Sequence, residues 1–170
     1  MEELLKTNRR DFLRTGGIAA AALALNLNAF EAEAAGGVTK LTILHTNDVH
    51  SRVEPFPIDG SKYEGLGGTA RRSALIKRIR SEEKNVLLFD AGDIFQGTPY
   101  FNKFGGELEI KLMTAMGYDA VTMGNHDFDN GMEGFYKQLP HANFPILSSN
   151  YDFSNTILNT PAPSNSLASA

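Results

Sequence analysis

The sequence of 170 residues contains no cysteine and no tryptophan. The absence of cysteine excludes a disulfide scaffold, a cysteine-ligated zinc site, an iron–sulfur cluster and a cysteine nucleophile. No apolar run reaches the roughly 18 residues of a membrane span, so we expect none in the mature chain. The formal net charge of −4 argues against a nucleic-acid polymer as a partner. What remains is an ordinary globular composition whose chemistry must come from Asp, His, Asn, Ser or Lys.

The first 35 residues have the order of an export signal. Residues 8–14 resemble the twin-arginine signal, because Arg9 and Arg10 precede x-Phe-Leu. The soft apolar stretch Gly16–Leu27 follows, and an Ala-x-Ala pattern ends at Ala34. We therefore expect residues 1–35 to be a signal peptide, the twin-arginine export machinery to be a partner, and the mature protein to be periplasmic or extracellular. The alternative is an N-terminal amphipathic helix of the mature protein.

Residues 36–153 alternate between short apolar runs and amphipathic stretches. The runs predict strands and the stretches predict helices, in the order 38–46 (strand), 67–84 (helix), 85–89 (strand), 107–116 (helix), 120–123 (strand), 132–139 (helix) and 145–148 (strand). Helices between consecutive strands favour βαβ units, so we expect an α/β fold with a mainly parallel sheet. Residues 154–170 are rich in Asn, Ser, Thr, Pro and Ala, which predicts a disordered or aberrant tail.

Polar clusters follow three of the predicted strands. They are His45–His50, Asp90–Asp93 and Gly124–Asp129. Ligands of an open α/β sheet bind beyond the carboxyl ends of its strands, so these clusters should converge. Their carboxylate, amide and imidazole groups suit Zn, Mn, Mg or Fe, which predicts a metal site.

The clusters contain ligands for two divalent ions. Asp48 and His50 are alternate residues, and an extended segment would direct both side chains to one ion. Asp93 follows Gly92, which permits a sharp turn, and its two oxygens suit a bridge between two ions. Asn125 offers a carbonyl oxygen to the second ion. Two such ions clamp the attacking and leaving oxygens of a phosphoryl group.

His126 and Asp129 form a candidate catalytic pair beside these ligands. The imidazole of His126 is placed to donate a proton or hydrogen bond to a phosphate or a leaving oxygen. Asp129, three residues later, is placed to hold that imidazole in one tautomer and to stabilise its charged form.

The motifs Leu41–His50, Phe89–Asp93 with Gln96–Thr98, and Gly124–Asp129 closely resemble calcineurin-like metallophosphatases. Within that family they are most similar to the exported 5′-nucleotidase / UDP-sugar hydrolase branch, and the resemblance runs from about Lys40 to Phe153. It implies an enzyme with a four-layer α/β/β/α sandwich, a pair of divalent ions, and a nucleotide or other phosphate-ester substrate. By the same resemblance Asp48, His50, Asp93 and Asn125 bind the metals, and His126 and Asp129 match the catalytic dyad.

The chain departs from the family pattern downstream of these motifs. The family has further metal-binding histidines, whereas only His141 follows His126 here. We therefore expect residues 36–153 to form the N-terminal half of the sandwich, with weak metal binding and an uncovered apolar sheet face. Three hypotheses stay open: a nucleotidase-type phosphomonoesterase, a truncated non-catalytic fragment of such an enzyme, and a related UDP-sugar or cyclic-nucleotide hydrolase.

Overall fold

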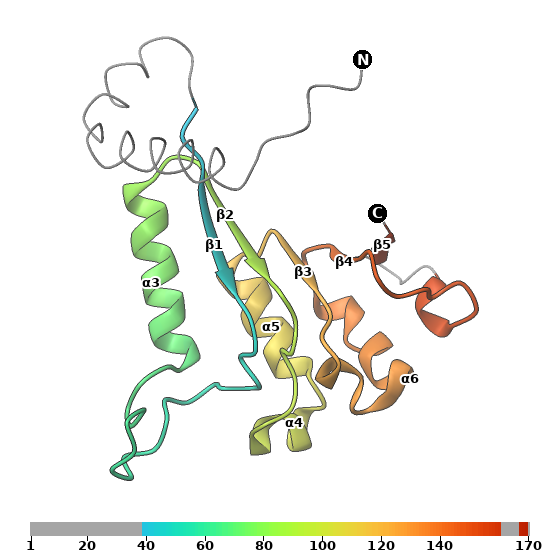
Figure 1. The fold of residues 1–170 in the computed structure, drawn as a ribbon, viewed down its shortest axis with the longest axis horizontal. Helices are drawn as coiled ribbons and strands as arrows, with labels where there is room; N and C mark the ends of the chain where they lie inside the picture. The colour runs from blue at the N-terminus through green and yellow to red at the C-terminus, as the bar shows by residue number, and fades with distance from the viewer. Residues whose placement is uncertain (1–38, 161–166, 170) are drawn as a thin grey trace, which may run out of the picture. The chain divides into compact units, whose positions relative to one another are not determined.

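A computed structural model describes residues 39–160 and 167–169 (Figure 1). The predicted signal peptide therefore lies outside the described residues. Strands and helices alternate in the order β1 (Thr42–Thr46), α3 (Thr69–Glu82), β2 (Val86–Asp90), α4 (Pro99–Phe104), α5 (Glu107–Met116), β3 (Ala120–Thr122), η2 (His126–Phe128), α6 (Gly131–Tyr136), η3 (Leu139–His141), β4 (Ile146–Ser148), η4 (Ile157–Asn159) and β5 (Leu167–Ser169).

The strands form a single parallel sheet in which spatial order equals chain order, β1-β2-β3-β4-β5 (Figure 1). Leu44 pairs with Leu88, Asp90 with Val121, and Val121 with Ile146. Parallel neighbours require crossover connections, and α3 and α5 occupy the first two of these. The expected α/β class with a parallel sheet is confirmed.

The core lies on one face of this sheet. Leu88 and Val121 project from the strands into a cluster that includes Ile76 of α3 and the α5 residues Ile110 and Met113, each at most 4% exposed. Aromatic rings continue the cluster toward the site, where Phe95, Phe101 and Phe135 pack together. Of the phenylalanines that follow Asp93 in the chain, Phe95 and Phe101 are buried beneath the loop, whereas Phe104 is substantially exposed.

The opposite face of the sheet is apolar and partly open. Successive residues of a strand point to opposite faces, so Ile43 and Leu147 project away from the core. These two side chains are 60% and 39% exposed. Among the described residues, no helix combines the length and apolar character needed to cross a membrane.

The segment after Phe153 differs from the disordered tail expected from its composition. Leu158, in η4, is 2% exposed and belongs to the core, and the Thr156 side chain caps this turn by accepting from the Leu158 amide. β5 pairs with β4 over three residues. Residues 154–160 thus include a turn that Leu158, the partly buried Ile157 and the Thr156 cap anchor to the core.

Candidate metal centre

Three loops at the carboxyl ends of β1, β2 and β3 meet to form the site. The loop after β1 runs alongside the loop after β2 through backbone hydrogen bonds. In these bonds Asp48 N donates to Gly92 O (2.9 Å), His50 N to Asp93 O (3.0 Å) and Ser51 N to Ile94 O (2.8 Å). The predicted convergence of the polar clusters is therefore present, and the backbone itself holds the first two loops together.

The backbone of these loops is left-handed at the residues that carry the ligands. Asp48 has φ 51°, His50 has φ 44° and Asp93 has φ 55°. The expectation that Asp48 and His50 lie on an extended segment is wrong. Non-glycine residues rarely adopt positive φ, and such strain persists only where surrounding bonds hold it, as the paired loops do here.

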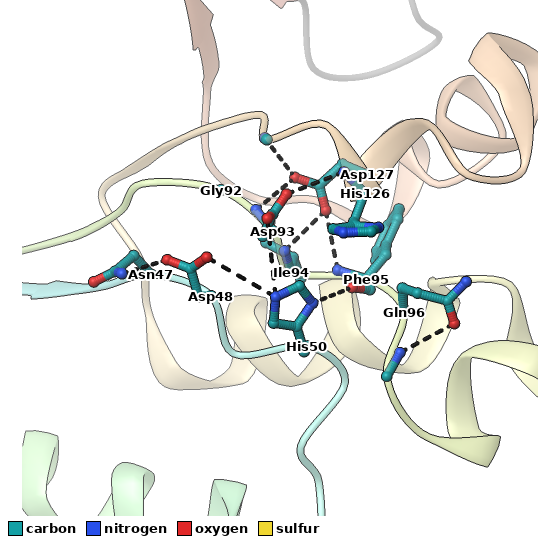
Figure 2. Close-up of polar contacts among 12 residues, drawn as sticks. Asn47, Asp48, His50, Gly92, Asp93, Ile94, Phe95, Gln96, His126 and Asp127 are labelled. Carbon is teal, nitrogen blue, oxygen red and sulfur yellow. Dashed lines mark hydrogen bonds and ion pairs between the residues drawn. The ribbon is translucent and has the colours of Figure 1, made fainter.

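Asp48, His50 and Asp93 form one cluster of possible metal ligands (Figure 2). Their ligand atoms lie within 4.8 Å of one another. His50 Nε2 is 3.9 Å from Asp48 Oδ1 and 3.9 Å from Asp93 Oδ2. The other ring nitrogen, Nδ1, lies 3.2 Å from Phe95 O, which leaves Nε2 to face the carboxylates. Two carboxylates and an imidazole oriented in this way fit a divalent cation.

Close approach between the second and third loops requires glycine. Gly92 has φ 97°, and a Cβ there would lie 2.3 Å from Gly124 N. A Cβ on Gly124 would lie 2.1 Å from Asp93 Oδ1. The sharp turn predicted at Gly92 is confirmed, and Gly124 is a second glycine that the site needs.

Asn125 and His126 follow this contact. Asn125 is exposed and precedes η2, and its backbone carbonyl oxygen, not its side-chain oxygen, accepts from Phe128 N (3.2 Å). His126 N donates to Asp93 Oδ1 at 3.0 Å, so Asp93 presents one oxygen to this amide and the other to His50. The rings of His50 and His126 lie edge to face with centroids 5.3 Å apart.

His126 and Asp129 are hydrogen-bonded, with Nδ1 3.0 Å from Oδ2. Gln96 Nε2 donates to the same oxygen at 3.0 Å. The hydrogen bond to Asp129 raises the pKa of His126, and the hydrogen bonds from His126 and Gln96 lower the pKa of Asp129. Gln96 belongs to the Gln96–Thr98 motif, but the sequence predicted no contact between its side chain and Asp129.

Asp127 is the residue that sequence reasoning missed. It is 1% exposed, and its Oδ1 accepts from the amides of Ile94 (2.9 Å) and Phe95 (3.0 Å). Its Oδ2 accepts from the amides of Asp93 (3.0 Å) and Gly124 (2.8 Å) (Figure 2). Burial raises the pKa of Asp127, and the four amide donors oppose that effect. One carboxylate therefore ties the second loop to the third.

A cleft of about 710 Å³ opens beside the cluster. Asp48 and His50 line it, together with the arginines 52, 71 and 72 and the side chain of Phe56. Arg52 lies over the Phe56 ring at 4.4 Å, and Arg71 donates to Gly65 O. A cleft of this volume with a few polar groups is typical of small-molecule sites.

The family profile of calcineurin-like phosphoesterases matches residues 41–164. The snake venom 5′-nucleotidase of Crotalus adamanteus is 52% identical over 120 residues, which is 68% of this chain and 20% of that protein. The 5′-nucleotidase of Homo sapiens is 50% identical over 121 residues, 68% of this chain and 21% of that protein. The chain thus spans about one fifth of the length of these curated relatives.

Solved structures agree with the sequence matches. The 5′-nucleotidase precursor from Thermus thermophilus is 42% identical with a TM-score of 0.62, over 67% of this chain and 23% of that chain. The NAD nucleotidase of Haemophilus influenzae is 37% identical with a TM-score of 0.62, over 69% of this chain and 22% of that chain. The family match covers most of the residues that form the sheet, the loops and the ligand cluster, so this chain belongs to the calcineurin-like phosphoesterase family.

Proposed function

We propose that this chain contributes to a phosphoesterase that hydrolyses nucleotide phosphomonoesters at a centre of two divalent ions. The observation that carries the proposal is the cluster of Asp48, His50 and Asp93 beside the His126–Asp129 pair. The cluster offers ligands for a cation, and the pair offers a proton donor next to it. Family membership favours phosphoester hydrolysis as the reaction that uses both.

The four proposed ligands divide between two ions. Asp48 and His50 would hold the first, Asp93 would bridge, and Asn125 would hold the second. Divalent cations in such a centre supply Lewis acidity toward phosphoryl oxygens and generate a nucleophile at neutral pH. The bridging role of Asp93 is supported by its side chain, 15% exposed, whose Oδ2 faces His50.

His126 would act on the substrate through Nε2, because Nδ1 is engaged by Asp129. The raised pKa keeps more of this imidazole protonated near neutral pH, so Nε2 donates a hydrogen bond to the phosphate or to the leaving oxygen. Asp129 and Gln96 hold the ring in the orientation that this donation needs.

The nucleotide class of substrate rests on the relatives and on the cleft. The curated relatives compared above are named as 5′-nucleotidases. The cleft beside the cluster is large enough for a nucleotide, and its arginines favour an anionic ligand. UDP-sugars and cyclic nucleotides share this chemistry and belong in the same substrate panel.

Metal binding to the purified chain is the first test. We expect Mn²⁺ to bind in isothermal titration calorimetry, and we expect Asp48→Asn, His50→Ala and Asp93→Asn each to weaken it. His45→Ala is the matched control, because His45 precedes the loop and lies outside the cluster. Unchanged Mn²⁺ affinity in all three cluster variants would refute the centre.

Activity is the second test. AMP, a UDP-sugar, a cyclic nucleotide and NAD are offered with Mn²⁺ or Zn²⁺, and released phosphate or nucleoside is measured. We expect AMP to be the preferred substrate and Asp93→Asn to abolish its hydrolysis. Binding of metal without hydrolysis of any substrate would favour a non-catalytic fragment, and a preference for another substrate would refute the nucleotidase assignment.

Export is a separate part of the proposal. Residues 1–35 would direct the folded protein to the twin-arginine machinery and be removed near Ala35. N-terminal sequencing of protein from the periplasm or medium of a bacterial host tests this. Replacing Arg9 and Arg10 together by lysine should retain the protein inside the cell, and export of this variant at the original level would contradict the assignment.

A further inference from the structure

A small cavity is lined by residues of the first metal-ligand loop, of α3 and of α5. Its volume is about 10 Å³, which matches one water-sized site. Five of its ten lining residues are apolar: Val49, Val53, Ile94, Leu112 and Met113. The polar residues include Ser51, Arg72 and Glu109, each from a different element or loop.

These three side chains carry polar atoms that are buried and have no hydrogen-bond partner among the residues that the structure describes. They are Ser51 Oγ, Arg72 Nε and both carboxylate oxygens of Glu109. Glu109 is 5% exposed and Ser51 is 2% exposed. A buried carboxylate with no partner is costly, so its presence in the wall of a cavity points to a bound group that satisfies it.

Donor and acceptor chemistry identifies that group. Arg72 Nε can only donate, an ionised Glu109 carboxylate can only accept, and the Ser51 hydroxyl can do both. A cation cannot accept from Arg72, and an anion without an O–H group cannot donate to Glu109, while anions such as hydrogen phosphate are larger than a cavity of about 10 Å³. We propose that the cavity binds a single ordered water molecule that accepts from Arg72 Nε, donates to the Glu109 carboxylate and bonds to Ser51 Oγ.

The water site joins the helices to the loop that carries Asp48 and His50. The backbone of Ser51 is held by the loop after β2, because its amide donates to Ile94 O (2.8 Å) and its carbonyl accepts from Thr98 Oγ1 (2.9 Å). Its side chain lines the cavity instead. The bridging water therefore extends the support of this left-handed segment to α3 and α5, and it requires neither metal nor substrate.

A crystal structure of the full chain, grown with a chelator, tests the site directly. We expect one water peak about 2.7–3.2 Å from Arg72 Nε, from a Glu109 oxygen and from Ser51 Oγ. A direct ion pair between Arg72 and Glu109, an empty cavity, or a metal ion at shorter ligand distances would overturn the inference.

A double-mutant cycle tests the same site in solution. Ser51→Ala and Glu109→Gln should each lower the urea midpoint, and the double variant should lose less than the two single losses combined, because both residues bond one water. Ser81→Ala, an exposed serine on α3, is the control and should combine additively with Glu109→Gln. Additive losses for Ser51→Ala and Glu109→Gln would overturn the shared water. If one of these variants fails to fold, the crystal structure of the native chain is the deciding test.

Discussion

The two parts of the candidate site are held in different ways. The second loop, which carries Asp93, is fixed from below by Asp127, whose buried carboxylate accepts from four amides. The side chains of the His126–Asp129 pair lie at the surface and are held by their mutual hydrogen bond and by Gln96, while the backbone amide of His126 donates to Asp93 Oδ1. The support of the Asp93 loop is therefore buried, whereas the side chains of His126 and Asp129 are supported by exposed groups.

The Asp93 loop is therefore expected to be more rigid than the side chains of His126 and Asp129. Buried hydrogen bonds are strong because water does not compete for them, whereas exposed pairs contribute little to stability. Metal ligands must hold a fixed geometry, and a proton donor must follow a substrate that enters and leaves. We therefore expect substitutions in the first part to reduce stability and metal affinity, and substitutions in the second part to reduce turnover alone.

Gly92→Ala should have the largest effect. The new Cβ would lie 2.3 Å from the backbone of Gly124, at φ 97°, so the two loops must separate. We expect a loss of about 5 kcal/mol in the free energy of unfolding, with no measurable Mn²⁺ binding. Urea unfolding and calorimetry measure both quantities.

Gly60→Ala is the matched control for this change. Gly60 also has positive φ, at 79°, but no atom of the described part of the chain, apart from its own neighbours in sequence, lies within 4 Å of its Cβ position. The free energy of unfolding of the Gly60→Ala variant should fall by about 1 kcal/mol, which is the cost of placing alanine in a left-handed backbone conformation. Equal losses for the two variants would show that close approach between the loops is unimportant.

Asp127→Asn should have the next largest effect. One end of the amide can still accept, but its NH₂ end faces two amide donors and leaves them unsatisfied. We expect a loss of about 4 kcal/mol in the free energy of unfolding and a clear fall in Mn²⁺ affinity, although Asp127 is not in the ligand cluster. Asp59→Asn, a surface substitution, is the control, and near-equal stability of the two variants would remove the contrast between the two parts of the site.

Asp90 makes the buried part sensitive to pH. Burial raises its pKa from 3.8 to about 6, against hydrogen bonds from Thr46 and Gly92 that lower it. The unfolded chain loses this proton first, so the contribution of Asp90 to stability falls as pH rises from about 4 to about 6. The gap between these two pKa values corresponds to about 3 kcal/mol in the free energy of unfolding.

Asp90→Asn should remove this dependence. In chelator, the free energy of unfolding of the variant minus that of the native chain should increase between pH 4 and pH 7 by up to about 3 kcal/mol. Urea unfolding at each pH measures it. A difference that stays constant with pH would show that Asp90 titrates at its ordinary value, and a difference that falls would show that folding lowers its pKa; either result would contradict the prediction.

Asp129→Asn should have the smallest effect on stability and a distinct effect on chemistry. The urea midpoint should stay unchanged, while turnover falls about 10²-fold. The pKa of His126, followed by NMR titration in chelator, should decrease because its hydrogen bond with Asp129 is the main cause of the increase. A marked loss of stability in this variant would show that the exposed pair is part of the fold after all.

The sequence predicted the positions of the main elements because periodicity reports burial. The helix expected over 107–116 has those bounds, and the strand expected over 120–123 occupies Ala120–Thr122. The sequence predicted no helix at α4, because its six residues are too few to show a period. β5 was missed because strand pairing is made by backbone groups, which composition does not report.

The sequence predicted the residues of the ligand cluster and of the catalytic pair, but not the backbone contacts that hold them in place. The cluster of Asp48, His50 and Asp93 and the hydrogen bond between His126 and Asp129 were expected, and the structure brings each set together. The left-handed backbone at Asp48 was not predicted, because the argument that Asp48 and His50 point to one side assumes an extended chain. The partners of Asp127 are backbone amides from 32 to 34 residues away, or three residues earlier, and residue identity does not encode them.

The order of the strands has a consequence for how the molecule is made. Each strand pairs with the strand synthesised just before it, so a newly made strand always finds its neighbour already present. Chains grow at about 5–20 residues per second, which leaves ample time for each crossover to close before the next strand emerges from the ribosome. The sheet can therefore assemble during translation from its first strand onward, and the loops that carry Asp48 and Asp93 can meet before the loop that carries His126 has been made.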